Sequence, residues 1–418
     1  MKKVLFLLIL FTSITVFSQE KLSLETCYSL MYKNYPLAKQ GDLLAKQNEL
    51  DLASIATKKL PTLELGAQTT YQSDVTQMPI SIPNTTVETP NKDQYKATFS
   101  VNQLIYNGGV IDATKKVSEA NLKEQQKNIE VRLHQLKKQV NAYYFSILLF
   151  NEKIALLNAK KTLLETKLKE VKAGIKFGVL LPTSDSVIEA ELLKINQQLK
   201  DISLSENNLT ASLSQLIGTP ISAKTEFENP SITTNFNTTL KRPEQALFQL
   251  QKEKIATSEN LLSKQNSPNL MGFATGGYGN PGLNMLDNSF QTFYQLGVKL
   301  NWNVFDWNSN KKQRESLLIN KDIVNNQEAI FQLNTNIELE QKQTEINKLS
   351  SLINSDKEII ELRKKILKSA ESQLKNGVIT SSAYITEVTN LFEAENNLRT
   401  HKIKMLLEKA NYNIIKGN

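Results

Sequence analysis

The chain has 418 residues, of which 40% are hydrophobic and 22% are charged, and its formal net charge is +8. This composition excludes a disordered tail, and the single cysteine, Cys27, excludes a disulfide framework within the chain. The basic residues are spread along the chain rather than gathered in a patch, which favours solvated helix faces over nucleic-acid binding. His134 and His401 are far apart in the sequence, so we expect both to be solvated and expect no metal site and no cofactor.

The first 18 residues have the pattern of a secretory signal peptide. Lys2 and Lys3 precede an apolar segment from Val4 to Phe17, and the predicted cleavage follows Ser18. That segment is too short for a transmembrane helix, which needs about 20 residues. Cys27 lies well past the cleavage point, so we expect a buried small hydrophobic residue there rather than a lipid attachment site. Without another apolar run, a mature chain that enters a membrane must do so with strands.

The rest of the sequence carries a duplicated pattern. Proline and tyrosine anchors of the first half recur 207 positions later, and the offset changes to 199 after a loop that is eight residues longer in the first half. At the offset of 199, Gly178-Val179 corresponds to Gly377-Val378. We therefore predict a first structural repeat over residues 19–218, an inter-repeat linker over 219–241 and a second repeat over 242–418.

Each repeat is predicted to consist of a helix, two strands, one very long helix and a returning helix. Residues 110–173 and 308–376 contain no glycine or proline, and helices of that length would be roughly 100 Å long. Apolar residues at spacings of three and four indicate coiled-coil packing against other helices. The predicted partners are returning helices over 183–217 and 378–416 and shorter helices over 37–59 and 244–264.

Four segments between the helices alternate between apolar and polar residues, as strands do: about 62–73, 94–104, 269–279 and 293–303, the third being Gly-rich and less clear. Each is about ten residues long, enough to cross a bilayer as a tilted strand. The polar side suits a water-filled lumen, although a half-solvated sheet in a soluble protein remains the alternative. Aromatic residues near the strand ends are candidates for the membrane interfaces: Tyr71, Tyr95, Tyr278, Tyr294 and Trp302.

Four strands cannot close a barrel, and an open sheet edge is not stable in lipid. The barrel must therefore be shared between chains. Two copies would give eight strands, whose interior is filled by side chains, whereas three copies would give twelve strands and room for an aqueous pore. A duct therefore favours three copies.

This order of elements, given twice after a signal peptide, resembles the TolC family of outer-membrane efflux proteins over essentially the whole mature chain. The resemblance implies a mainly α fold with a small transmembrane β part. It further implies a homotrimer whose twelve-strand β-barrel lies among the lipids of the outer membrane of a Gram-negative bacterium and continues as a long α-helical barrel in the periplasm. The matching pieces are Arg242-Pro243-Glu244, the strand-to-helix turns 103–109 and 302–306, and the tip segments 178–191 and 377–395.

The family also implies a function. The chain would be the passive outer-membrane channel of a tripartite efflux or type I secretion system, with a periplasmic adaptor (membrane fusion) protein at its tip turns and an inner-membrane transporter beyond. No catalytic residue is needed, and we expect no enzyme activity. The alternative is a non-channel coiled-coil structural or adaptor protein of the periplasm or cell surface. The candidate adaptor contacts are Gly174, Gly178, Val179, Leu180, Gly377, Val378 and Ile379.

The tip glycines also have a local explanation, because a helix that ends in a reversal uses glycine for a positive φ. Acidic residues follow the tips, and we expect them to lie on solvated helix faces: Glu189, Glu191, Glu393 and Glu395.

Overall fold

The computed structural model describes residues 21–77, 89–222, 224–236 and 240–417, so the predicted signal peptide lies outside the described residues. The chain forms two compact units, and each draws on both predicted repeats. The helical unit comprises the chain up to Lys39, Val131–Arg242 and Gln332–Asn418. The sheet unit comprises Gln40–Glu130 and Pro243–Phe331. No helix in the described ranges is long and apolar enough to cross a membrane.

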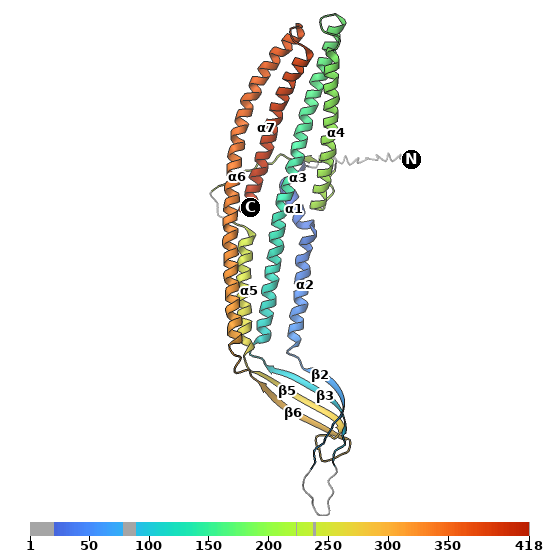
Figure 1. Ribbon diagram of the computed structural model, residues 1–418, viewed down its shortest axis with the longest axis vertical. Coiled ribbons are helices and arrows are strands. Elements are labelled where there is room, and N and C mark those ends of the chain that lie inside the picture. Colours follow the sequence, from blue (N-terminus) through green and yellow to red (C-terminus); the bar gives the residue numbers. More distant parts are fainter. Residues whose placement is uncertain (1–20, 78–88, 223, 237–239, 418) are drawn as a thin grey trace, which may run out of the picture. The chain divides into compact units, whose positions relative to one another are not determined.

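The sheet unit contains four antiparallel strands in the order β2-β3-β5-β6, as Figure 1 shows. The central pair, β3 and β5, joins the two predicted repeats. The strand bounds are β2 Thr62–Tyr71, β3 Asp93–Tyr106, β5 Asn269–Asn280 and β6 Gln291–Asn301. The helices that enter this unit are α2 Pro36–Thr57, α3 Val110–Lys176, α5 Pro243–Gln265 and α6 Ser309–Lys375.

The Gly-rich third strand is a full strand, and its glycines have a packing reason. The ring of Phe293 on β6 lies against Gly277 on β5, where a Cβ atom would come within 2.3 Å of the ring carbon Cζ. The ring of Phe273 lies against Gly297 in the same way, with 2.6 Å between the ring and a built Cβ atom. At Gly277 the missing side chain therefore makes room for an aromatic ring of the neighbouring strand, and the reverse arrangement, with a ring of β5, is found at Gly297 on β6.

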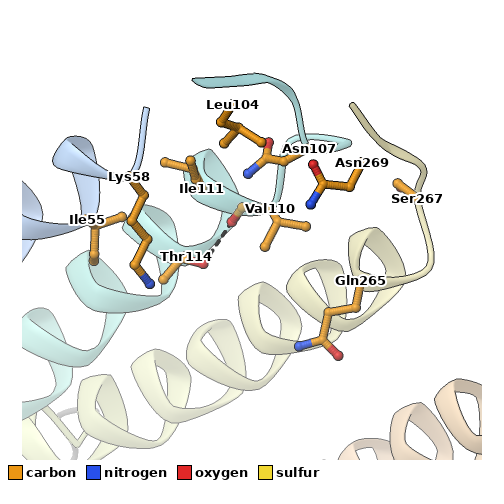
Figure 2. Close-up of a pocket in the computed structure, with 10 residues that line it drawn as sticks. All are labelled: Ile55, Lys58, Leu104, Asn107, Val110, Ile111, Thr114, Gln265, Ser267 and Asn269. Carbon is orange, nitrogen blue, oxygen red and sulfur yellow. Dashed lines mark hydrogen bonds between the residues drawn. The ribbon is translucent and has the colours of Figure 1, made fainter. Parts of the chain in front are cut away.

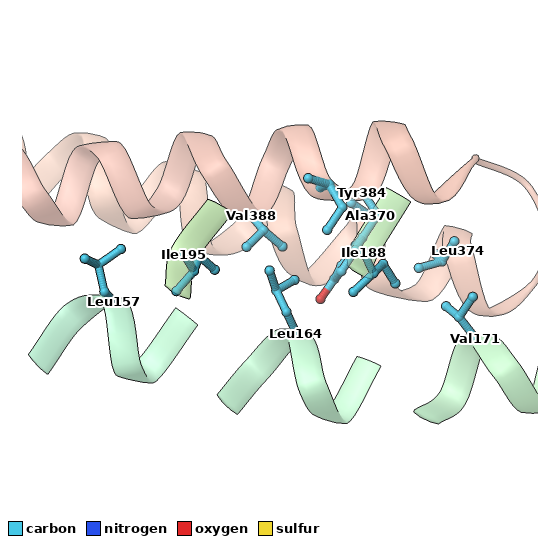
Figure 3. Close-up of a cluster of buried hydrophobic side chains, with 10 residues drawn as sticks. Leu157, Leu164, Val171, Ile188, Ile195, Ala370, Leu374, Tyr384 and Val388 are labelled. Atoms are coloured by element: carbon cyan, nitrogen blue, oxygen red, sulfur yellow. The ribbon is translucent and has the colours of Figure 1, made fainter. Parts of the chain in front are cut away.

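The helical unit is held together by coiled-coil packing between long helices. Besides parts of α3 and α6 it contains α1 Leu24–Asn34, α4 Ser184–Ile217 and α7 Ser381–Lys416. Leu157, Leu164 and Val171 of α3 are buried at seven-residue spacing and face Ile188 and Ile195 of α4 (Figure 3). The same core includes residues of α6 and α7: Ala370, Leu374, Tyr384, Ile385 and Val388. The spacing is that of a coiled-coil seam, so the predicted helix packing is confirmed.

The helical unit also contains a pair of short strands, formed by the N-terminal segment and the segment between the predicted repeats. Strand β1, Lys21–Leu22, pairs in parallel with β4, Glu226–Phe227, in the segment between the predicted repeats. The hydroxyl of the fully buried Tyr144 lies 2.8 Å from the carbonyl oxygen of Leu22 and 2.7 Å from that of Glu228. One tyrosine on α3 therefore ties the N-terminal strand to a segment about 200 residues later.

Cys27 is fully buried in α1, as predicted. Burial, with a smaller contribution from Glu25, raises the pKa of its thiol to about 12, so the nucleophilic thiolate is scarce at neutral pH. We expect N-ethylmaleimide to leave the native protein unlabelled over minutes at pH 7 and to label it fully in guanidinium chloride. Mass spectrometry of the intact chain measures both results. Rapid labelling of the native form would show that α1 is not packed as described.

Three expectations about polar residues are wrong. His134 is 4% exposed, and its Nε2 atom donates to the carbonyl oxygen of Ile414 at 2.8 Å. His401 is partly buried, with its Nδ1 atom 2.6 Å from Oδ2 of Asp356. The Glu191 carboxylate lies 2.7 Å from Nζ of Lys160, and the two side chains are only 15% and 6% exposed. Each of these residues faces another helix rather than solvent.

Candidate membrane sheet and helix tips

The two faces of the sheet differ in chemistry. The strand register places Leu65, Phe99, Gly276 and Tyr294 in one row across all four strands. The adjacent row, on the opposite face, is polar: Glu64, Ser100, Thr275 and Gln295. Within that polar row, Ser100 Oγ and Thr275 Oγ1 are hydrogen-bonded at 3.1 Å. The alternation predicted from single strands thus extends across these two rows, although Phe273 and Phe293 lie on the same face as the polar row.

The apolar face is uncovered. Leu65 is 86% exposed and Leu296 is 70% exposed, and other members of this face are also exposed: Leu63, Phe99, Val298 and Leu300. A soluble sheet buries its apolar face and exposes its polar one. Apolar area left in water costs roughly 25 cal/mol per Å², so a contiguous exposed face of this kind marks a contact with lipid or protein.

The predicted interface aromatics lie at two levels of the sheet. Tyr71, Tyr95, Tyr278 and Tyr294 all lie toward the end that carries the connecting loops, as the register shows. At that end Phe290 stacks on Tyr278, with ring centroids 5.3 Å apart. Trp302 lies at the opposite end, directly after β6, and its Nε1 atom donates to the carbonyl oxygen of Asn266 at 3.1 Å. The separation fits two interfaces of one bilayer, and the interface role of these residues stays a prediction.

The outer strands of the sheet have open edges. Strand β2 pairs only with β3, and β6 pairs only with β5, within the described part of the chain. The helices next to these strands in sequence also carry exposed apolar residues. On α2 these are Leu43 and Leu50, and on α6 they are Ile319, Ile323 and Ile330. The two edges of the sheet, formed by β2 and β6, therefore expose main-chain hydrogen-bonding groups. The helices that adjoin these strands in sequence expose apolar side chains, so both edges can bind another molecule.

A small cavity of about 240 Å³ lies where the strands meet the helices (Figure 2). Its walls include Leu104, Val110 and Ile111, together with Asn107 and Asn269. Lys58 is the one ionisable residue among its lining residues, so the cavity offers no acid–base pair. Within the described ranges, no group of three or more histidine, cysteine, aspartate or glutamate residues could hold a metal ion.

The two tip turns have the same backbone geometry. Gly178 and Gly377 adopt φ values of +70° and +68° after α3 and α6. In the first turn the Gly178 amide donates to Ile175 and the Val179 amide donates to Gly174; in the second, the corresponding donors reach Leu374 and Gln373. These are paired Schellman caps, and they satisfy carbonyl groups that the ends of the helices leave free. The local explanation of the tip glycines is therefore supported directly.

Gly174 has a different role from the capping glycines. The Leu180 side chain folds back on it, so that a Cβ atom at Gly174 would lie 2.9 Å from Cδ1 of Leu180. Leu180 and Ile379 are partly buried against the helical core, whereas Val179 and Val378 are exposed. The sequence interpretation missed Phe177 and Leu181, which are 77% and 64% exposed in the same turn. Both residues lie within three positions of Gly178, and this proximity to the predicted tip glycine is the sequence signal that could have identified them.

A groove of about 770 Å³ lies beside the first tip turn, between the ends of α3 and α6. Its walls include Val171, Gly174 and Leu374. Lys167 is buried at its rim and lies 2.6 Å from Glu170 and 2.8 Å from Glu371. Burial by itself would lower the pKa of Lys167, but the hydrogen bonds to the two carboxylates raise it above the usual value. The lysine therefore stays charged and links α3 to α6.

Alanine at either capping glycine should destabilise its tip by about 1–2 kcal/mol, because an L-residue is strained at positive φ. We expect limited proteolysis to nick Gly178→Ala and Gly377→Ala at the tips sooner than the unmodified protein. Gly41→Ala is the matched control, since Gly41 is helical and a Cβ atom there would meet nothing within 4 Å. Equal nicking rates for all three variants would contradict the capping role.

Comparisons with known proteins agree with this geometry. A family model described as outer membrane efflux protein matches residues 43–219. No curated protein sequence matches the chain significantly. The outer membrane protein VceC from Vibrio cholerae has a TM-score of 0.68 at 15% identity, over 94% of this chain and 96% of VceC. The CmeC outer membrane channel from Campylobacter jejuni has a TM-score of 0.67 at 14% identity, over 94% of this chain and 85% of CmeC.

A third structure, the MtrE outer membrane channel from Neisseria gonorrhoeae, has a TM-score of 0.66 at 14% identity, over 94% of this chain and 89% of MtrE. The fold is therefore that of outer-membrane channel proteins. The family model matched over residues 43–219 and the fold both agree with the resemblance of the sequence to the TolC family of outer-membrane efflux proteins.

Proposed function

We propose that this chain is the outer-membrane channel of a tripartite efflux or type I secretion system, a passive trimeric duct from the periplasm or a transporter to the exterior. The observation that carries the proposal is the sheet with one exposed apolar face, one polar face and two open edges. Such a sheet is stable when lipid covers the apolar face, water fills the polar side and further copies of the sheet close both edges.

Three copies satisfy these conditions. They would give twelve strands, enough for a water-filled lumen lined by rows such as Glu64, Ser100, Thr275 and Gln295. The exposed apolar residues on α2 and α6 support closure by the same copies, because these helices adjoin the two edge strands in sequence. In this arrangement α3, α4, α6 and α7 of each copy would contribute to an α-helical barrel in the periplasm.

The proposed function depends on binding other proteins and involves no catalysed reaction. A duct has no catalytic step, and the family consists of channel proteins, so we assign no enzyme activity to this chain. The energy for transport would come from an inner-membrane transporter, joined through a periplasmic adaptor at the tips. The alternative is a coiled-coil structural or adaptor protein without a channel. It explains the long helices, but it does not explain why the apolar face of the sheet is exposed.

The test is the oligomeric mass and single-channel conductance of protein extracted from the membrane fraction with detergent. We expect a stable trimer that conducts ions in a planar bilayer. A soluble monomer or dimer, released from the periplasm without detergent and with no conductance, would overturn the proposal.

The tip turns are the proposed adaptor contact, because exposed Val179 and Val378 lie on two turns of the same backbone geometry. Replacing both with aspartate should abolish efflux in a complementation assay by removing apolar contact and adding charge. Trimer mass and single-channel conductance should stay unchanged, since neither side chain is packed in the core. Val179→Ile with Val378→Ile is the control and should retain efflux. Full efflux by the aspartate variant would place the adaptor contact elsewhere.

A further inference from the structure

The two strand-to-helix turns of the sheet unit share a backbone conformation but differ in side chains. After β3, Gly108 and Gly109 have φ values of +65° and +82°. After β6, the corresponding residues are Trp307 and Asn308, with φ values of +55° and +61°. Residues with a Cβ atom avoid this region, and a bulky aromatic residue there is a clear outlier. The second turn thus holds a strained tryptophan where the first holds glycine.

Packing within the sheet unit explains the glycine but not the tryptophan. A Cβ atom at Gly108 would lie 2.0 Å from Cβ of Ser267, so the first turn has no room for a side chain. Trp307 is 80% exposed, and its ring meets Phe305 edge-on with centroids 4.8 Å apart. Phe305 is itself 65% exposed, so the pair buries little apolar surface to offset the strain. An exposed residue kept in a strained conformation points to a partner outside the chain.

The exposed residues around Trp307 continue the apolar face of the sheet. Leu296, Val298 and Leu300 share this face with Trp302, which is 58% exposed directly after the strand. Val304 follows and is 72% exposed. We call Trp302, Val304, Phe305 and Trp307 the junction cluster. It begins where the uncovered face of β6 ends.

Basic residues lie immediately beyond the junction cluster. Lys311, Lys312 and Arg314 are exposed in the first turns of α6, and Lys58 and Lys264 are exposed at the ends of α2 and α5. Acidic groups are fewer: Glu315 is exposed beside Arg314, and two others have partners. Asp306 accepts from the amide of Asn310 and from the side chain of Asn266, and Glu259 pairs with Arg314 at 2.8 Å. The local charge is therefore positive.

The order of apolar strand, aromatic cluster and basic helix start matches the order of layers in a bilayer. Acyl chains meet the apolar residues, the headgroup boundary accommodates tryptophan with its polar ring nitrogen, and anionic phosphates attract lysine. A protein partner would not require that sequence of chemistries along one element. The uncovered sheet face leads directly into the cluster, so a single surface passes from one layer to the next.

We infer that the junction cluster binds the headgroup boundary of the periplasm-facing leaflet of phospholipid, with Lys311 and Lys312 at the anionic headgroups. Trp307, held in its strained conformation by the turn, inserts into this boundary and fixes the depth of the sheet. The inference rests on the proposed function, because it requires the sheet to cross a bilayer.

The chain offers a direct spectroscopic test, because its only two tryptophans, Trp302 and Trp307, both belong to the junction cluster. Trp302→Phe leaves Trp307 as the single emitter. The protein is reconstituted into phosphatidylcholine and phosphatidylglycerol vesicles whose acyl chains carry bromine near the carbonyl end or near the methyl end. We expect the carbonyl-end bromines to quench Trp307 about twofold more than the methyl-end bromines, since an interfacial side chain lies within roughly 10 Å of the headgroup boundary.

A second reporter separates this inference from the proposed function. Leu296→Trp, in a background with Trp302→Phe and Trp307→Phe, places the emitter in the middle of the apolar face. Methyl-end bromines should quench this reporter more strongly if the sheet spans the bilayer. If they do, while Trp307 is quenched by aqueous iodide and not by brominated lipid, the inference fails and the proposed function stands. If brominated lipid quenches neither emitter, both fail.

The lysines provide a matched measurement of headgroup chemistry. Comparing quenching by brominated phosphatidylglycerol and brominated phosphatidylcholine gives the relative affinity of the site around Trp307 for the two lipids. Lys311→Gln with Lys312→Gln should lower the preference for phosphatidylglycerol by about fivefold for each lysine removed. An unchanged preference would overturn the assignment of anionic headgroups to these lysines. Trp307→Gly, which relieves the backbone strain, should leave trimer mass in detergent unchanged; loss of the trimer would instead show that Trp307 acts within the protein.

Discussion

Leu296→Arg should abolish insertion and trimer formation. Leu296 is 70% exposed near the middle of β6, on the apolar face of the sheet. An arginine facing lipid near the bilayer midplane costs about 2–4 kcal/mol per site, and a trimer would carry three of them. We expect the variant to stay out of the membrane fraction or to be degraded. The amount of trimer in heat-treated and unheated gel samples of the membrane fraction measures this effect.

The neighbouring residue gives a matched control. Gln295 is adjacent on the same strand but lies in the polar row with Thr275, so its side chain points to the other face. Gln295→Arg should therefore assemble normally and change only the conductance or ion preference of the channel. If both variants assembled equally well, lipid could not cover the face that contains Leu296, and the membrane orientation of the sheet would be wrong.

Glu191→Ala should strongly destabilise the helical unit. The carboxylate of Glu191 lies 2.7 Å from Nζ of Lys160, whose side chain is only 6% exposed. Lys160 also lies 3.3 Å from the Thr389 hydroxyl and over the Phe392 ring, so it connects α3, α4 and α7. Removing one partner of a buried ion pair strands the other charge, at a cost of about 3–5 kcal/mol. The denaturation midpoint, followed by circular dichroism, should fall accordingly.

Two further variants keep this prediction specific. Glu189 pairs with Lys172 on the same two helices, but both side chains are about half exposed, so Glu189→Ala should leave the midpoint unchanged. Combining Lys160→Met with Glu191→Leu removes both charges and should recover most of the lost stability. A midpoint for Glu191→Ala equal to that of Glu189→Ala would show that the Lys160 pair is solvated after all.

The residues that sequence reasoning placed correctly are those governed by local periodicity. The seven-residue spacing of Leu157, Leu164 and Val171 indicates a helix seam whatever the partner is. The alternation around Leu65 and Leu296 likewise defines the faces of the strands. Both patterns depend on residues close together in the chain, which is why the helices, the strands and the fold class could be predicted.

The residues that sequence reasoning misplaced depend on contacts between distant segments. Glu191 and His134 have polar neighbours in sequence, a pattern that predicts solvent exposure. In the fold, each contacts a residue of another helix instead. The Gly-rich strand β5 was unclear because its cover comes from Phe293 on another strand. Trp307 could have been noticed as a departure from the paired glycines of the first turn, but its positive φ is visible only in the structure. The predicted repeat boundaries stay predictions, and the compact units cut across them.

The antiparallel order of the sheet has a genetic consequence. The free edges, β2 and β6, come from different halves of the chain and run in opposite directions. In the proposed trimer, copies related by rotation would therefore join β6 of one to β2 of the next, and every junction in the closed ring would be the same. An allele that blocks only the β6 edge would still present an intact β2 edge to normal copies. Its product would enter mixed assemblies and leave them open, so the mutation should be dominant rather than recessive.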